Sequence, residues 1–302
     1  MRVACIGECM VELSSLGGDQ FALAFGGDTL NTAVYMARSG VGVDYVTALG
    51  DDHLSARMLA QWQAEGVGTT RVLRLPGLLP GLYMIERDAR GERSFPYWRD
   101  RAPARDLFDV ATDDYVAALA EYDWLYFSGI TLSLYGEQGR ARFIAMLRAA
   151  KAKGARIAFD GNYRPRGWAG PEAARAAFNA ILPLVDVALP TLEDEQAVFG
   201  DSDAEAVAKR MTDAGVSEVV VKQGAGGCLV AAGASRLHVP VPAPVSPIDT
   251  TAAGDSFNAA FLAARIKGAP PEAAARAGHS LAGRVIQHRG ALIAREHMPE
   301  AS

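Results

Sequence analysis

Short apolar runs alternate with longer helical segments along most of this 302-residue chain, and no other feature limits the fold as strongly. The alternation is typical of parallel strands joined by helical crossovers. The expected strands are residues 3–7, 43–49, 124–128, 156–160, 185–189, 218–222 and 228–232. The expected helices are residues 29–39, 54–65, 137–153, 171–184, 204–214, 256–267 and 271–287. The sequence therefore predicts an α/β fold with a mostly parallel central sheet flanked by helices.

Glycines mark the ends of several expected helices. They stand at Gly40, Gly66, Gly154, Gly215 and Gly268. A glycine just after the last helical residue readily adopts the left-handed conformation that often ends a helix. These positions support the expected helix boundaries.

Two segments break the alternation, residues 8–25 and 75–101. Both consist of short strand-like runs and turns. In the second segment, residues 82–86 and 93–98 flank the turn-like sequence Asp-Ala-Arg-Gly at 88–91, which predicts a hairpin. We interpret the two segments together as a small antiparallel β lid on the main sheet.

The composition limits the partners that the protein can have. A formal net charge of −5 and a pI near 5.6 argue against a general binder of nucleic acid or anionic membranes. Cys5, Cys9 and Cys228 have no metal-ligand spacing and do not suit a disulfide framework, so a reducing cytoplasm is expected. The apolar run at residues 3–6 is too short for a signal peptide or a membrane span. No linker composition divides residues 1–302, which are expected to form one domain.

The run Asp-Thr-Thr-Ala-Ala-Gly-Asp at residues 249–255 directly precedes an expected helix. Small residues let the backbone approach a ligand, so the amides of 252–255 could bind an anion at the positive end of the helix dipole. A carboxylate in such a cradle repels phosphate, but it is useful if it takes a proton from an attacking hydroxyl. The run therefore indicates phosphoryl transfer with Asp255 as the base. The alternative is that Asp255 only caps the helix.

A second motif lies near the N-terminus, where Gly26 and Gly27 are followed by Asp28 and then by Asn31. On these two motifs, and across nearly its whole length, the chain resembles the ribokinase (PfkB) family of carbohydrate kinases. Within that family it is most similar to the kinases of the sugar acid 2-keto-3-deoxy-D-gluconate. This similarity rests on residues 7–13, 80–83, 97–99 and 160–164. The resemblance implies a ribokinase-like fold and phosphoryl transfer from ATP.

By this resemblance, Asp255 is expected to be the general base that deprotonates the sugar hydroxyl. The backbone amides of Ala252, Ala253 and Gly254 would form an anion hole around the transferred phosphoryl group. The family usually has glycine where this chain has Ala252. Because the extra methyl group leaves the backbone N–H in place, the anion hole is still expected to form.

Metal binding is implied by a motif that this chain has in altered form. The family commonly has Asn-x-x-Glu, which helps to organise magnesium and phosphates, whereas this chain has Thr191 and Asp194 at those positions. Asp194, with Glu193 or Glu195 nearby, would order Mg²⁺ through water, because this ion needs few direct protein ligands. The alternative is an exposed acidic helix start.

Substrate recognition depends on charge, because a sugar carboxylate pairs well with arginine. Arg99 lies in the expected lid, and Arg164 follows the strand that ends at Asp160, at the edge where open α/β sheets bind ligands. The alternatives are a solvated hairpin face for Arg99 and lid packing or a subunit interface for the lid aromatics. By the resemblance, the substrate-binding residues are expected to be Gly27, Asp28, Asn31, Tyr83, Tyr97, Arg99, Arg164 and Asp255.

The nucleotide is expected to bind at the glycine-rich turn 222–227, where adenosine or its phosphates could approach the backbone. Hairpin turns use the same glycines without any ligand, which is the alternative. Family analogy adds phosphate contacts from the segment after the strand 156–160. The expected nucleotide-binding residues are Asn162, Arg164, Thr191, Lys222, Gly224, Ala225, Gly227, Ala252 and Gly254.

The predicted function is phosphorylation of 2-keto-3-deoxy-D-gluconate to its 6-phosphate, with ATP and Mg²⁺. The nearest alternative is a kinase of the same family for a neutral sugar, such as fructose or ribose, or for a nucleoside. A sugar- or nucleotide-binding regulatory protein without turnover is the alternative from a different class. A monovalent cation such as K⁺ near Asp249 and Thr251 is a family feature that the sequence leaves open. The oligomeric state is also open, and the lid is where a homo-oligomer would form.

Overall fold

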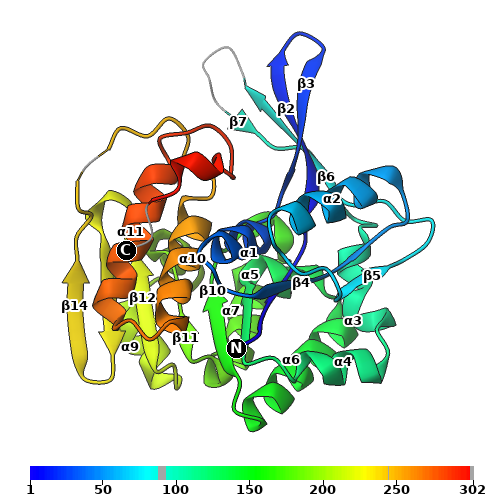
Figure 1. The fold of residues 1–302 in the computed structure, drawn as a ribbon. Helices are drawn as coiled ribbons and strands as arrows, with labels where there is room; N and C mark the ends of the chain where they lie inside the picture. The colour runs from blue at the N-terminus through cyan, green and yellow to red at the C-terminus, as the bar shows by residue number, and fades with distance from the viewer. Residues whose placement is uncertain (88–92, 244, 300–302) are drawn as a thin grey trace.

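The computed structural model describes residues 1–87, 93–243 and 245–299, and its centre is a nine-stranded sheet (Figure 1). In spatial order from one edge, the strands are β14 (Ser235–Val239), β13 (Cys228–Ala232), β12 (Glu218–Lys222), β11 (Val187–Ala188), β10 (Arg156–Asp160), β9 (Trp124–Ser128), β1 (Val3–Ile6), β4 (Val43–Leu49) and β5 (Val72–Arg74). The strands from β5 to β12 pair in parallel, and β13 and β14 add an antiparallel edge. The mostly parallel sheet is confirmed.

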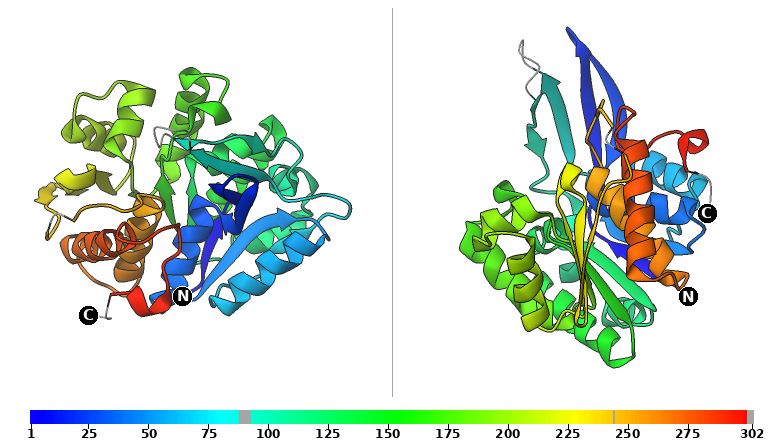
Figure 2. Two further views of the ribbon diagram at one scale, coloured as in Figure 1. Left: turned by 90° about the horizontal axis from the view of Figure 1, so that it is seen from above. Right: turned by 90° about the vertical axis from the view of Figure 1, so that its left-hand side faces the viewer.

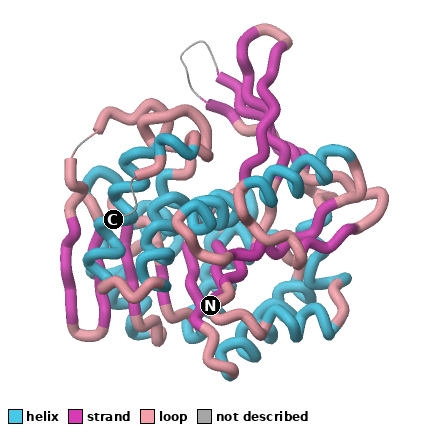
Figure 3. The backbone as a smooth tube through the Cα atoms, in the orientation of Figure 1, coloured by secondary structure: helices cyan, strands magenta, loops and turns pink. Residues whose placement is uncertain are grey.

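Helices cover both faces of this sheet (Figures 2 and 3). One face carries α1 (Asp28–Arg38), α2 (His53–Ala64), α10 (Ala253–Ile266) and α11 (Pro271–Val285). The other carries α3 (Leu107–Val110), α4 (Asp113–Leu119), α5 (Gly129–Leu134), α6 (Glu137–Ala152), α7 (Pro171–Ile181), α8 (Leu192–Phe199) and α9 (Ala204–Asp213). Strand residues alternate between the two cores: Cys5 packs with the first group and Ile6 with the second. Both neighbours are apolar because both faces are buried.

The helix-ending glycines behave as expected. Gly40, Gly66, Gly154, Gly215 and Gly268 have φ values of 77°, 82°, 90°, 106° and 92°. This left-handed conformation has little steric cost for a residue without a Cβ atom. The predicted helix ends therefore lie within a few residues of the observed ones.

Other boundaries differ from the prediction. The strand expected at 185–189 is reduced to the two residues of β11. The helix expected at 171–184 ends earlier, at Ile181, because a 3-10 turn at Leu182–Leu184 replaces its last three residues. α10 begins at Ala253, three residues before the expected start at 256, so the small residues of the motif belong to the helix itself.

A second, smaller sheet stands away from the end of the main sheet (Figures 1 and 2). It contains β2 (Met10–Gly17), β3 (Gln20–Gly26), β6 (Leu82–Arg87), β7 (Arg93–Ser94) and β8 (Tyr97–Trp98). Its pairings are antiparallel, except that β2 and β6 run in parallel. The antiparallel pairing of β6 with β7 and β8 confirms the hairpin, whose predicted turn at 88–91 lies outside the described residues.

Within the described ranges, no helix has the length and hydrophobicity that a membrane span requires.

Candidate active site

Side chains from distant segments meet where the parallel strands end. β9, β10 and β12 end at Ser128, Asp160 and Lys222, and the carboxyl ends of parallel strands lie at one edge of a sheet. The first turns of α1 and α10 lie together, because Asn31 of α1 donates a hydrogen bond to Asp255 of α10. The two sequence motifs, whose bonded residues are 224 positions apart, are therefore in direct contact.

Asp255 is in the first turn of α10, which begins after Ala252. Ala252 has a left-handed φ of 59°, and no side chain among the described residues caps this helix start. Asp255 Oδ2 instead accepts a hydrogen bond from Asn31 Nδ2 at 2.9 Å. Its carboxylate therefore points toward α1, and the alternative of a simple helix cap has no support.

The charge environment of Asp255 makes its carboxylate more basic. Its pKa is raised to about 7, chiefly because burial disfavours the charged form and then because Asp28 lies nearby. The hydrogen bond from Asn31 and the charge of Lys222 lower the pKa in part, while Asp160 adds to the increase. A carboxylate with a pKa near neutrality can accept a proton under physiological conditions.

Asp28 is held by the loop that follows β10. Asn162 Nδ2 donates to Asp28 Oδ2 at 2.6 Å, and Asn162 has a left-handed φ of 33°. Burial raises the pKa of Asp28, while hydrogen bonds from Ser128 and Asn162 lower it. Gly27, just before Asp28, has no room for a side chain, since a Cβ atom would lie 2.2 Å from the Glu8 carbonyl oxygen. Three of the expected substrate-binding residues, Gly27, Asp28 and Asn31, therefore lie together.

The lid contributes an ion pair that sequence reasoning did not anticipate. Arg99 Nη2 donates to the carboxylate of Glu8, whose side chain is only 2% exposed. Burial raises the pKa of Glu8, and the charge of Arg99 opposes this effect. Because the two residues are 91 positions apart, only the folded chain reveals the pairing. Part of the guanidinium of Arg99 is thus already occupied.

The lid aromatics differ in their contacts and in their exposure. Tyr83 donates to Glu12, and its ring lies 5.8 Å from that of Tyr97 at 31°. Trp98 is 58% exposed and Tyr97 42% exposed. Tyr83 and Tyr97 therefore lie together as expected, and Glu12 is a polar neighbour that the motifs did not identify.

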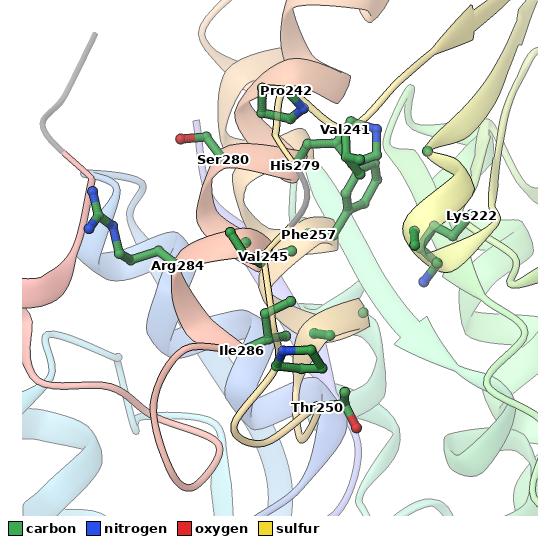
Figure 4. A pocket seen from close by; sticks show the side chains of 18 of the residues that line it. Lys222, Val241, Pro242, Val245, Thr250, Phe257, His279, Ser280, Arg284 and Ile286 are labelled. Carbon is green, nitrogen blue, oxygen red and sulfur yellow. The ribbon is translucent and has the colours of Figure 1, made fainter.

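A cavity of about 780 Å³ lies between the turn after β12 and helices α10 and α11 (Figure 4). Six expected nucleotide-binding residues line it: Thr191, Lys222, Gly224, Ala225, Gly227 and Gly254. Its lining does not include three others, Asn162, Arg164 and Ala252. Much of the remaining wall is apolar, with Val241, Pro242, Val245, Phe257 and Ile286. Val241, Pro242 and Val245 belong to the segment between β14 and α10, where no sequence motif indicated a cavity wall.

The acidic residues of α8 have separate environments. Glu195 is fully buried and pairs with Arg210 at 2.7 Å, and burial raises its pKa to about 7. Glu193 is exposed. Asp194 is half-buried, and its Oδ1 lies 3.6 Å from Arg164 Nη1. No group of three or more potential metal ligands is found in the described ranges. Asp194 therefore pairs with Arg164, whereas the carboxylate of Glu195 lies beside Gly161 and pairs with Arg210.

The first residue of the 249–255 run holds the loop in place. Asp249 Oδ1 accepts from the Thr251 backbone N–H at 3.0 Å and from its hydroxyl at 2.6 Å. Asp249 Oδ2 accepts from the Gly290 N–H at 3.1 Å. The carboxylate thus ties the loop before α10 to the segment after α11.

Comparison with known proteins assigns this site to a protein class. Residues 1–298 match the pfkB family of carbohydrate kinases. The chain belongs to this family, and its fold is ribokinase-like, so it is a carbohydrate kinase.

Individual relatives are similar over the full length. The chain is 47% identical to the 2-dehydro-3-deoxygluconokinase of Dickeya dadantii, over 99% of this chain and 98% of the relative. It is also 47% identical to the 2-dehydro-3-deoxygluconokinase of Escherichia coli K12, over 99% of both chains. Among solved structures, the fructokinase of Vibrio cholerae with fructose, ADP and calcium is 25% identical, with a TM-score of 0.84 over 96% of this chain and 94% of that one.

The raised pKa of Asp255 predicts a stability effect. The pKa of Asp255 is higher in the folded protein, at about 7, than in the unfolded chain, at 3.8. The free energy of unfolding therefore decreases as the pH rises from 3.8 through about 7. Asp255→Asn should therefore increase the free energy of unfolding at about pH 8, by an amount on the order of 2 kcal/mol. The gain should shrink as the pH is lowered toward about 5. Urea unfolding of both proteins at several pH values measures it, and a gain that stays constant with pH would contradict the assigned pKa.

Proposed function

We propose that the protein transfers the γ-phosphoryl group of ATP to 2-keto-3-deoxy-D-gluconate, also called 2-dehydro-3-deoxygluconate, giving the 6-phosphate. The observation that carries this proposal is the contact between Asp255 and Asn31, which joins the expected base to the glycine motif beside a large cavity. The names of the full-length relatives support the choice of substrate.

Asp255 acts as the general base in this proposal. Its carboxylate takes the proton of the substrate hydroxyl, whose oxygen then forms a bond to the γ-phosphorus. The bond between that phosphorus and the β–γ bridging oxygen breaks, and ADP leaves with the electron pair. The amides of Ala252, Ala253 and Gly254 stabilise the negative charge on the transferred group, because they lie at the positive end of α10.

The nucleotide occupies the cavity beside this helix end. Its apolar wall suits a purine ring, and the turn at Gly224 and Ala225 offers backbone groups to the rest of the nucleotide. Asn162 and Arg164, which lie outside the cavity lining, serve phosphates nearer to the sugar. Asp194 would hold Mg²⁺ through water, and the bound ion would neutralise phosphate charge. A monovalent cation such as K⁺ beside Asp249 and Thr251 remains part of the proposal.

The sugar lies between the glycine motif and the lid. Gly27, Asp28 and Asn31 hold its hydroxyl groups, while Tyr83 and Tyr97 cover it from the lid. Arg164 is the main partner of the carboxylate, because its side chain is 59% exposed and its ion pair with Asp194 is long, at 3.6 Å. Arg99 is a weaker candidate for this role because it already pairs with Glu8.

The same pairing of Arg99 with Glu8 favours a second candidate function. If the charges of Arg99 and Glu8 neutralise each other, only Arg164 of the two expected arginines is left to pair with the carboxylate of a sugar acid. The substrate would then be a neutral sugar, as in the 25%-identical Vibrio cholerae fructokinase. The two candidates share the base, the anion hole and the nucleotide cavity.

We infer further that residues 1–302 form a single kinase domain with a lid from about 8–25 and 75–101. The outer lid exposes large apolar side chains, namely Leu16, Phe21, Leu23 and Trp98. Such a surface suits contact with a second copy of the chain, so a homo-oligomer through the lid is part of the proposal.

Replacement of the base is the first test. Asp255→Asn should retain the binding of ATP and sugar but lose about 10²–10⁴-fold in kcat, the usual contribution of a positioned base. Steady-state kinetics and calorimetric binding measure the two properties. Asp109→Asn on α3 is a control at a distant carboxylate. Unchanged turnover in Asp255→Asn would reject the mechanism.

A substrate panel is the second test. The value of kcat/KM should be higher for 2-keto-3-deoxy-D-gluconate than for fructose or ribose. Arg164→Ala should reduce this preference by about tenfold or more, since a charge-assisted contact contributes roughly 1.5–3 kcal/mol. Arg99→Ala should reduce it less. A higher value for a neutral sugar in the unmodified protein would favour the second candidate.

A further inference from the structure

A buried lysine lies at the end of β12 without a role in recognition of the sugar. Lys222 is 8% exposed, and its Nζ donates to Asp160 Oδ2 at 3.1 Å and to Asn258 Oδ1 at 3.0 Å. Asn258 in turn donates to Asp160 Oδ2 at 2.7 Å and to the hydroxyl of Tyr126 at 3.1 Å. The ammonium group contacts Asp160 of β10 and Asn258 of α10, and Tyr126 of β9 accepts from Asn258, so the folded core fixes its position.

Within the described part of the chain, one donor of the ammonium group has no hydrogen-bond partner. It carries three N–H bonds, and Asp160 and Asn258 account for two of them. The nearest side-chain atom to a Cβ built on Gly254 is Lys222 Nζ, at 3.5 Å. Lys222 and Gly254 also line the same cavity. The remaining N–H is therefore beside the backbone that the proposed anion hole uses.

Lys222 and Asp160 form an ion pair in the interior, with Nζ 3.1 Å from Oδ2 and both side chains less than 10% exposed. A pair of this kind adds little net stability compared with apolar residues of the same size. Stability therefore does not explain why a charged side chain lies here, whereas its location beside the proposed anion hole suits contact with a phosphoryl group.

We propose that Lys222 is a catalytic residue that contacts the transferred phosphoryl group, and that Asp160 and Asn258 are positioning residues which hold its ammonium group beside Gly254. This inference rests on the proposed phosphoryl transfer and specifies a further group that stabilises it. A fixed cation beside the anion hole stabilises negative charge that develops on the phosphoryl oxygens, and no reorganisation is needed. The position of Nζ next to Gly254 distinguishes this role from nucleoside binding at Gly224 and Ala225.

Three variants test the proposal: Lys222→Met, Asp160→Asn and the double variant with both changes. Lys222→Met should lower kcat by about 10²–10³-fold, the typical effect of losing one such donor. Its affinity for ADP should stay close to that of the unmodified protein, whereas its affinity for a non-hydrolysable ATP analogue should fall. Lys209→Met, at an exposed lysine of α9, is the matched control and should change neither property.

The double variant separates positioning from folding. It removes both buried charges, so it avoids the uncompensated carboxylate that could prevent Lys222→Met from folding. If Asp160 acts through Lys222, the double variant should lose no more turnover than Lys222→Met alone. Losses that multiply would show that Asp160 acts independently and would overturn its positioning role.

The nucleotide affinities decide the role of Lys222. An equal loss of affinity for ADP and for the ATP analogue would overturn the proposal, because Lys222 would then bind the part that both nucleotides share. Unchanged kcat in a folded variant would also overturn it. If the unmodified protein shows no sugar-dependent release of ADP from ATP, the proposed function itself fails, which is a separate outcome.

Discussion

Three carboxylates, Asp28, Asp160 and Asp255, lie close enough at one edge of the sheet for their charges to interact, and the site depends on how they are accommodated. Like charges in a buried region repel one another, so each needs a partner. Asp28 accepts from Asn162, Asp160 from Lys222, and Asp255 from Asn31. These partners come from distant parts of the sequence, and each contact also joins two elements of the fold.

This constraint connects stability with chemistry. Burial, and then the neighbouring carboxylates, raise the pKa of Asp255 and so make its carboxylate more basic, but they also make its charged form less stable in the folded protein. The hydrogen bond from Asn31 and the charge of Lys222 stabilise the charged form of Asp255 in part, but its pKa stays raised. The loop after β10 also combines an energetic cost with a contact in the site. Asn162 has a left-handed backbone conformation, which is unfavourable, and its side chain donates a hydrogen bond to Asp28.

The sequence predicted the parts of the fold whose signals are local. Strands at 43–49, 124–128, 156–160, 218–222 and 228–232 were predicted with the observed bounds, since they are mostly apolar runs between clear stops. The short helices α3, α4, α5 and α8 and the three-residue β5 were missing from the predicted elements, because so few residues give no clear periodicity.

The candidate site could be predicted to a similar extent and for a similar reason. The run at 249–255 is a compact motif that pointed to Asp255, and the resemblance to the PfkB family, carried in part by Gly26–Gly27, added the choice of base over helix cap and the role of Asn31. The pairing of Glu8 with Arg99 and the apolar wall of the cavity depend on which elements become neighbours after folding. No local pattern encodes such contacts.

The central claim is that Asp255 is a general base whose pKa is set by burial and by its carboxylate neighbours. The pH dependence of kcat/KM tests it most directly, because this parameter reports ionisations of the free enzyme. The account predicts that kcat/KM for 2-keto-3-deoxy-D-gluconate rises with pH through an apparent pKa of about 7, as Asp255 loses its proton. A value that stays constant from about pH 5 to about pH 8 would contradict it.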